Sequence, residues 1–227
     1  MEGKLTAISR QEALRYVGCP EGPAPAEIST LLEEAVAQVM ALAQPRVIWR
    51  EFPLEKGNKL VGTDFTLEGE EIKALLADCD RCILMAATLG GQVEQKLRTW
   101  QLTDMTKALL LDGCASAAIE NVCDNLEREL AQQYLNQGDY LTDRFSPGYG
   151  DMPITQQGGF CGVLDTQRRM GLCVSSSGLL IPRKSVTAVM GVAKTPQPHR
   201  GGSCAGCRLM ADCGFRKRGT TCYGKKL

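Results

Sequence analysis

The sequence predicts an α+β fold in which helices pack on a mainly antiparallel sheet. Apolar residues recur at helical spacing through the first two thirds of the chain, whereas several short β-like stretches follow residue 159. Helices and strands do not alternate regularly, as they would in a doubly wound parallel sheet. The chain has 227 residues, of which 44% are hydrophobic, so it is long enough to bury a full core.

The first hundred residues show helical and strand patterns in turn. Ser9 and Glu12 have the spacing of a capping box, which predicts a short helix over 10–17. The further elements expected here are a helix over 28–40, a strand over 46–54, a short strand over 63–67, a helix over 69–79, a buried strand over 81–88 and a helix from about 92.

A long helix is predicted from a cap at Thr103 or Asp104 to about residue 134. Its apolar residues fall on one stripe, which comprises Ala108, Ala115, Ile119, Val122, Leu126 and Leu130. Glu120 lies at the edge of this stripe, where a carboxylate faces either a cleft or solvent. We expect this helix to be the spine of the domain.

The remainder of the chain divides into three parts. A turn-rich segment precedes short β-like stretches at 159–165, 172–175 and 185–192. The Pro- and Gly-containing residues that follow resemble a linker. We therefore expect a folded body over 1–193, a linker over 194–203 and a small cysteine-rich, metal-binding tail over 204–227.

Charge and hydropathy exclude several classes of protein. Lys and Arg number 26 and so do Asp and Glu, which leaves no overall basic field to hold a nucleic acid or an anionic membrane. No apolar run approaches the roughly 18 residues of a membrane span, and the first residues lack the apolar core of a secretory signal. We expect a cytoplasmic protein whose scattered cysteines are reduced thiols.

The segment from Arg144 to Tyr149 fits the pattern R-x-x-x-G-Y and is soon followed by Pro153. Flanking matches occur at 86–90 (AATLG) and 170–172 (MGL), and then in Ile-Pro at 181 and Ser-Val at 185. Together, in this order, these segments resemble the activation domain of cobalamin-dependent methionine synthase. The likeness covers roughly residues 80–195, and a weaker one reaches back to residue 8.

The resemblance implies that this body binds S-adenosylmethionine. Arg144 would pair with the carboxylate of the methionine moiety, since a planar guanidinium grips a carboxylate with two hydrogen bonds. The backbone of Pro147, Gly148 and Tyr149 would hold the adenine end, and Glu120 would face the ligand.

The same resemblance implies a function in trans. The protein would support reductive remethylation of the cobalamin carried by a methionine synthase, or by another corrinoid protein, with electrons from a separate donor. The chain shows no counterpart of the catalytic, folate and cobalamin modules of the full synthase. A tyrosine that the family places beyond the Ser-Val turn also has no counterpart in 189–200.

Four cysteines near the C-terminus predict a metal site: Cys204, Cys207, Cys213 and Cys222. Only the first two make a short zinc-type knuckle, whereas a four-iron, four-sulfur cluster tolerates the irregular spacing. The pattern fits either metal, and free redox-labile thiols are the third interpretation. Two alternative functions follow: an iron-sulfur electron-transfer activase for a corrinoid protein, and a zinc-stabilised, non-catalytic docking protein.

Overall fold

The computed structural model describes residues 1–19, 24–55, 58–197, 212–217 and 219. Its helices and strands are, in chain order, α1 (Arg10–Tyr16), α2 (Ala26–Leu42), β1 (Arg46–Glu55), β2 (Lys59–Leu60), α3 (Glu70–Leu75), β3 (Cys79–Thr88), α4 (Gly91–Thr103), α5 (Met105–Leu135), β4 (Tyr140–Leu141), the 3-10 turn η1 (Ile154–Gln156), α6 (Gln157–Leu164), α7 (Thr166–Met170), β5 (Cys173–Val174), β6 (Leu180–Ile181), β7 (Ser185–Ala193) and α8 (Gly214–Lys217).

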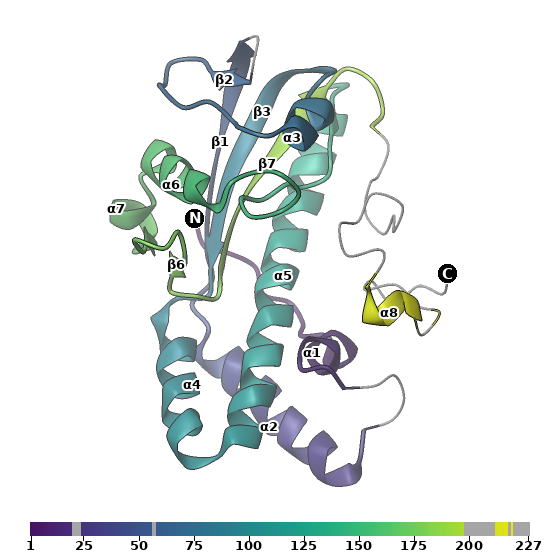
Figure 1. Cartoon of the computed structure of the whole chain (residues 1–227), viewed down its shortest axis with the longest axis vertical. Helices are drawn as coiled ribbons and strands as arrows, with labels where there is room; N and C mark the ends of the chain where they lie inside the picture. Colours follow the sequence, from purple (N-terminus) through teal and green to yellow (C-terminus); the bar gives the residue numbers. More distant parts are fainter. Residues whose placement is uncertain (20–23, 56–57, 198–211, 218, 220–227) are drawn as a thin grey trace.

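A five-stranded sheet separates two groups of helices (Figure 1). Its strand order is β2-β1-β3-β7-β4, and all neighbouring strands run antiparallel. The strands β5 and β6 form a separate antiparallel pair. These observations confirm the predicted α+β class and the antiparallel sheet.

The central strand β3 is buried on both faces because helices cover both sides of the sheet. Successive side chains of a strand point to opposite faces. Ile83 and Met85 accordingly join the core on the α5 side, whereas Leu84 and Ala86 join the core on the α6 side. The continuous apolar run that predicted a buried strand here thus fills two cores.

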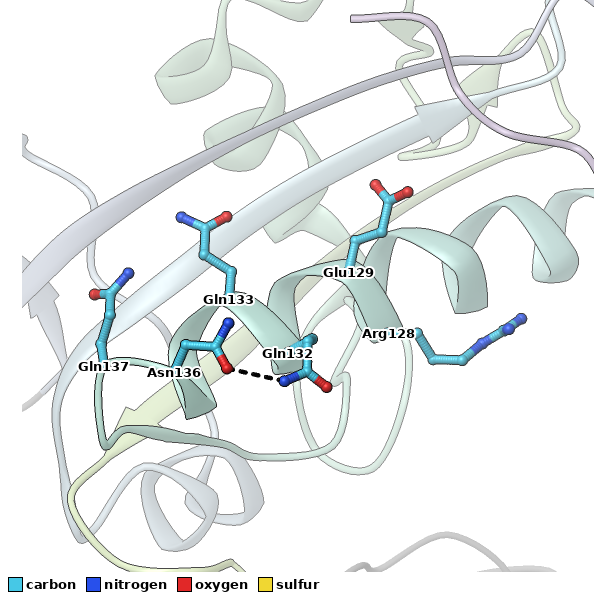
Figure 2. Close-up of a pocket in the computed structure, with 6 residues that line it drawn as sticks. All are labelled: Arg128, Glu129, Gln132, Gln133, Asn136 and Gln137. Carbon is cyan, nitrogen blue, oxygen red and sulfur yellow. Dashed lines mark hydrogen bonds between the residues drawn. The ribbon is translucent and has the colours of Figure 1, made fainter.

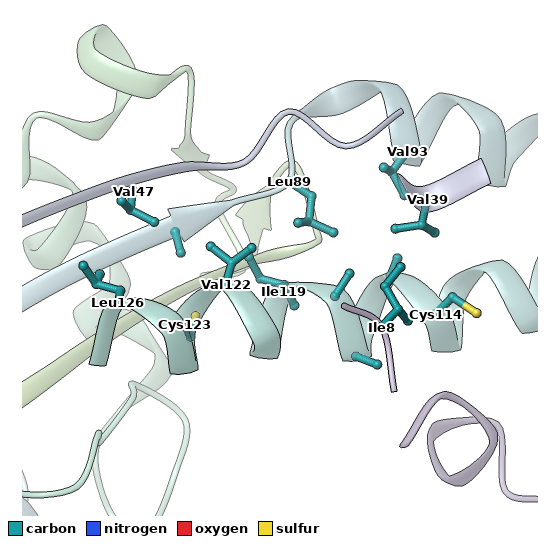
Figure 3. Packing of buried hydrophobic residues seen from close by; sticks show 14 of the residues in the cluster. Ile8, Val39, Val47, Leu89, Val93, Cys114, Ile119, Val122, Cys123 and Leu126 are labelled. Carbon is teal, nitrogen blue, oxygen red and sulfur yellow. The ribbon is translucent and has the colours of Figure 1, made fainter. Parts of the chain in front are cut away.

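The long helix α5 is the spine that the sequence predicted. The Asp104 side chain caps it by accepting a hydrogen bond from the Lys107 N–H at 3.0 Å. Every residue of the predicted apolar stripe is buried, and Ile119 and Val122 lie among the side chains of the main core (Figure 3). Although α5 has 31 residues, neither it nor any other described helix is apolar enough to cross a membrane.

The short helix α1 packs closely against α5. Its predicted cap is present, since Ser9 Oγ accepts the Glu12 N–H at 3.3 Å. At the contact, a Cβ on Gly113 of α5 would lie 2.6 Å from the Ala13 carbonyl oxygen and 2.7 Å from Val17 Cγ1. Only glycine therefore lets the two helices approach this far.

Three sequence predictions of secondary structure were wrong. Residues 159–165 form a helix, α6, because a short apolar run does not by itself distinguish a strand from a buried helix. Residues 63–67 form no strand beyond one isolated bridge between Lys59 and Thr66. The helix predicted over 69–79 ends at Leu75, and Cys79 already belongs to β3.

The predicted boundary near residue 193 stays a prediction. Strand β7 ends at Ala193, and the next residue, Lys194, donates to Asp139 Oδ1 at 2.6 Å, so the body holds the start of the predicted linker. Of the four tail cysteines, Cys213 is half-buried and the other three lie outside the described residues.

We predict that Gly113→Ala destabilises the protein, because the added Cβ meets the backbone of α1. Gly162 of α6 is the matched control, since a Cβ there has nothing within 4 Å and gains the same helix propensity. The free energy of unfolding in urea should be lower for Gly113→Ala than for Gly162→Ala by about 1 to 3 kcal/mol. Equal values would show that α1 does not depend on this close approach.

Candidate functional site

The loop over 144–153 is held between the sheet and α3. Phe145 exchanges two backbone hydrogen bonds with Val189 of β7, at 2.9 and 2.8 Å. At the other end, the Asp151 carboxylate accepts the N–H of Glu70 at 2.6 Å, at the start of α3. Anchors at both ends fix the course of the loop across the edge of the sheet.

The middle of the loop is a tight turn that requires glycine. Gly148 has φ = +91°, in the region that other residues rarely adopt. Its N–H donates to the Met152 carbonyl at 3.0 Å, and the Tyr149 N–H donates to the Ser146 carbonyl at 3.1 Å. Pro147 is buried, whereas Tyr149 is 68% exposed. The turn therefore presents the Tyr149 side chain at the surface.

Arg144 joins this loop to α5 through three carboxylates. Its Nη2 lies 2.5 Å from Asp124 Oδ1 and 3.5 Å from Glu120 Oε2, and its Nε lies 2.7 Å from Glu127 Oε2. The three acidic residues are spaced four and three apart, which places them on one face of the helix. The Arg144 side chain is only 18% exposed, so these ion pairs are shielded more than ordinary surface pairs.

Burial and the charge of Arg144 have opposite effects on the pKa of Glu120. Burial raises the pKa of its carboxyl, the Arg144 guanidinium acts to lower it, and the nearby carboxylates of Asp124 and Glu12 raise it further. The net direction is upward, so the folded protein disfavours the ionised form of Glu120. Groups with such perturbed pKa values gather at binding and catalytic sites.

Two tyrosines experience the charge of this carboxylate. Partial burial, followed by the charge of Glu120, raises the pKa of Tyr16 to about 12. Sequence reasoning missed Tyr16, because nothing in the pattern of the first helix distinguishes it from a surface residue. Tyr16 belongs to α1, which contacts Gly113 of α5 through Ala13 and Val17.

The structure thus brings together Arg144, Glu120 and Tyr149, which the sequence proposed as site residues. The accompanying Asp124 and Glu127 were missed, although their spacing from Glu120 on one helix could have indicated them. The roles of these residues in binding stay predictions.

The flanking motif residues lie elsewhere and support the sheet. Ser185 Oγ donates to Thr88 Oγ1 at 2.8 Å and lies 2.7 Å from the Pro182 carbonyl oxygen. Ser185 is four residues from Val189, which corresponds to roughly 13 Å along β7. We interpret this network as a support for the end of the sheet.

A comparison with solved structures matches nearly the whole chain. The crystal structure of the MetH reactivation domain bound to AdoHcy superposes with a TM-score of 0.61 at 13% sequence identity, covering 95% of this chain and 82% of that one. The chain has the fold of the MetH reactivation domain. No protein-family model and no curated protein sequence matches it.

Among the residues that the structure describes, no group of three or more His, Cys, Asp or Glu side chains could bind a metal ion. Cys204, Cys207 and Cys222 lie outside those residues, so the predicted tail site stays a prediction.

A separate open depression lies toward the C-terminal end of α5 (Figure 2). Its volume is about 690 Å³, and its lining residues are Arg128, Glu129, Gln132, Gln133, Asn136 and Gln137. All of them come from one helix and the turn that follows it, and Gln132 already donates to Asn136 at 3.0 Å. No residue of the candidate site lines this depression.

We predict a pH-dependent gain in stability for Glu120→Gln. Because the folded pKa of Glu120 lies above its ordinary value, wild-type stability falls as pH rises through that interval. The variant should therefore melt at a higher temperature than the wild type at pH 8, and the difference should shrink at pH 4. Thermal unfolding across this pH range measures the effect.

The control is Glu55→Gln, at the exposed end of β1, which should show no such pH-dependent gain. A Glu120→Gln variant that is less stable than the wild type at pH 8 would contradict the assignment, because ion pairing with Arg144 would then outweigh burial.

Proposed function

We propose that this chain binds S-adenosylmethionine and presents its methyl group to the cobalamin of a methionine synthase, or of another corrinoid protein, in trans. The observation that carries the proposal is the R-x-x-x-G-Y loop, whose Arg144 lies against Glu120. This arrangement occurs on the fold of a domain that was solved with AdoHcy bound. AdoHcy is the product that remains when S-adenosylmethionine loses its methyl group.

The charges of the site suit the amino-acid end of the ligand. Arg144 supplies a guanidinium for the carboxylate, and Glu120 supplies a carboxylate for the ammonium group. The two side chains come from different elements and already lie 3.5 Å apart. A zwitterionic ligand can insert between them and make one ion pair with each.

The pairs that Arg144 makes in the free protein fix its position. Asp124 and Glu127 hold two of its nitrogens, and the guanidinium has five N–H donors in all. When the ligand carboxylate replaces Glu120 at the Arg144 guanidinium, Asp124 and Glu127 keep the guanidinium in place. This arrangement reduces the entropy that would be lost on binding.

The loop backbone offers acceptors for the adenine ring. The N–H groups of Gly148 and Tyr149 are used within the turn. We therefore assign the carbonyl oxygens of Pro147 and Gly148 as acceptors for the adenine amino group. The positive φ of Gly148 orients this peptide, and the absent side chain permits close approach of the ring.

The residues of this chain contribute only by positioning the bound S-adenosylmethionine. The partner's cobalamin, once reduced to cob(I)alamin by one electron from a separate donor, would supply the electron pair for the new bond to the methyl group, and the carbon–sulfur pair would stay on sulfur. The sulfonium becomes a neutral thioether, so no proton moves and no acid or base is needed. Arg144 and the loop hold the methyl group toward the open face of the site.

The second part of the proposal concerns the cysteine-rich tail. Cys204, Cys207, Cys213 and Cys222 would bind either an iron-sulfur cluster, which could deliver the electron, or a structural zinc ion. Metal analysis of anaerobically purified protein distinguishes them. Iron with a visible absorption that bleaches on reduction supports the activase alternative, and zinc alone supports the docking alternative.

We predict that Arg144→Lys weakens S-adenosylmethionine binding by about 1.5 to 3 kcal/mol, roughly ten- to more than hundredfold. Lysine keeps the positive charge but cannot make the bidentate hydrogen bond of a guanidinium to the ligand carboxylate. Isothermal titration calorimetry measures the dissociation constant. Arg98→Lys is the control, since Arg98 is an exposed residue of α4 that pairs with Glu94. An unchanged constant for Arg144→Lys would remove this residue from the site.

A chain that ends at Gln197 should stay folded and bind S-adenosylmethionine as the full chain does. It keeps all of β7 and the ion pair of Lys194 with Asp139, and a metal that organises one contiguous segment stabilises mainly that segment. Circular dichroism and calorimetry test this. Unfolding of the shortened chain would show that the tail belongs to the body.

A further inference from the structure

Four exposed apolar side chains lie beside the turn of the 144–153 loop. They are Tyr149 of the loop, Ile154 of η1, and Leu179 and Ile181 of the hairpin that β5 and β6 form, and each is between 38% and 68% exposed. Single apolar residues are common on protein surfaces, whereas contiguous groups of them mark binding surfaces. We call these four side chains the apolar face.

Close contacts join the three segments into one surface. A Cβ on Gly148 would lie 3.0 Å from Ile154 Cδ1, and a Cβ on Gly178 would lie 3.3 Å from Ile154 Cγ1. Ile154 therefore lies between the turn of the loop and the turn of the hairpin. Each of these glycines is followed directly by an exposed member of the apolar face, Tyr149 or Leu179.

The hairpin directs Leu179 and Ile181 outward. The Ser175 N–H donates to the Leu179 carbonyl at 2.8 Å, and the Leu179 N–H donates to Ser175 Oγ at 3.0 Å, so the turn satisfies its own backbone. Leu180 is buried in the core on the α6 side. Because successive side chains of a strand alternate, Leu179 and Ile181 share the opposite, exposed side.

This part of the chain carries little charge. Residues 145–182 contain four charged side chains, those of Asp151, Asp165, Arg168 and Arg169, although charged residues make up 23% of the whole chain. Asp151 accepts a hydrogen bond at the start of α3, and Asp165 pairs with Arg168. Depletion of charge together with an exposed tyrosine is typical of the centre of a protein–protein interface.

We propose that the apolar face is the docking surface for the protein that carries the corrinoid, and that the partner's contact surface there is apolar and uncharged. This inference deepens the proposed function and rests on it.

The proposed reaction places the partner on this face. Methyl transfer requires the cobalt to approach the loop that holds S-adenosylmethionine, and a specific protein interface buries about 800 Å² and roughly 20 to 30 residues on each side. An interface of that extent around Tyr149 also covers Ile154, which contacts the same turn, and Leu179 in the adjoining hairpin. Salt screens contacts between charges, whereas it does not screen apolar contacts.

The test is titration of the full chain, saturated with S-adenosylmethionine, with a cobalamin-loaded methionine synthase module that lacks its own activation domain. We expect Leu179→Glu and Ile181→Glu each to weaken the association by about tenfold or more, because each places an unpaired charge in an apolar contact. The wild-type dissociation constant should change by less than about threefold between low and high ionic strength.

Leu102→Glu is the matched control, since Leu102 is an 89% exposed leucine near the end of α4. The adjoining start of α5, at Met105, lies roughly 22 Å along that helix from Glu120. This variant should keep the affinity for the module within about twofold of wild type. All three variants should bind S-adenosylmethionine as the wild type does, which calorimetry measures.

Each other outcome overturns a defined claim. If the wild type bound S-adenosylmethionine but not the module, or if both hairpin variants bound the module as the wild type does, the docking surface would be refuted while the ligand site stands. An equal loss in Leu102→Glu would refute it as well, and a steep fall in affinity with salt would show a charged interface instead. A wild-type dimer that Leu179→Glu separates in sedimentation velocity would assign the apolar face to a second copy of the chain. If the wild type bound neither S-adenosylmethionine nor the module, the proposed function would fail and this inference with it.

Discussion

The position of α5 against the sheet is the constraint on which the rest of the structure depends. One face of the helix is buried against β3 and β7, and that burial fixes its rotation about its own axis. Glu120, Asp124 and Glu127 are thereby placed at the edge of the buried face, beside the loop that follows β4. Arg144 can join the loop to the helix only because this rotation brings the three carboxylates to it.

Two further contacts complete the site from elements that are distant in sequence. Phe145 pairs with Val189 of β7, so the sheet fixes the position of the loop along the axis of α5. Gly113 lets α1 pack closely on the N-terminal half of α5 through Ala13 and Val17. The site is consequently a property of the packing: no single segment contains it. It also carries a partly buried carboxylate whose ionised form is disfavoured, a local conflict of the kind that binding sites retain and structural cores avoid.

The sequence predicted those features that local patterns determine. The apolar stripe from Ala108 to Leu130 predicted α5, because periodicity over many turns is a strong signal. Segment 159–165 was wrongly predicted as a strand. Its apolar run is short, and its glycines have no side chains that would indicate which face packs against a neighbour. Gly159, for example, is required because a Cβ there would lie 2.1 Å from the ring of Phe65. Arg144 and Glu120 were found through resemblance, but their mutual ion pair depends on the packing of the loop against α5, which no local pattern encodes.

The central claim is that this chain delivers a methyl group to a corrinoid on another protein. The most direct measurement follows methyl-labelled S-adenosylmethionine into a cobalamin-loaded methionine synthase module that lacks its own activation domain, under reducing conditions, with and without this chain. The account predicts that labelled methylcobalamin forms at a rate that rises with the concentration of the chain and falls for Arg144→Lys. An equal rate with and without the chain would contradict it.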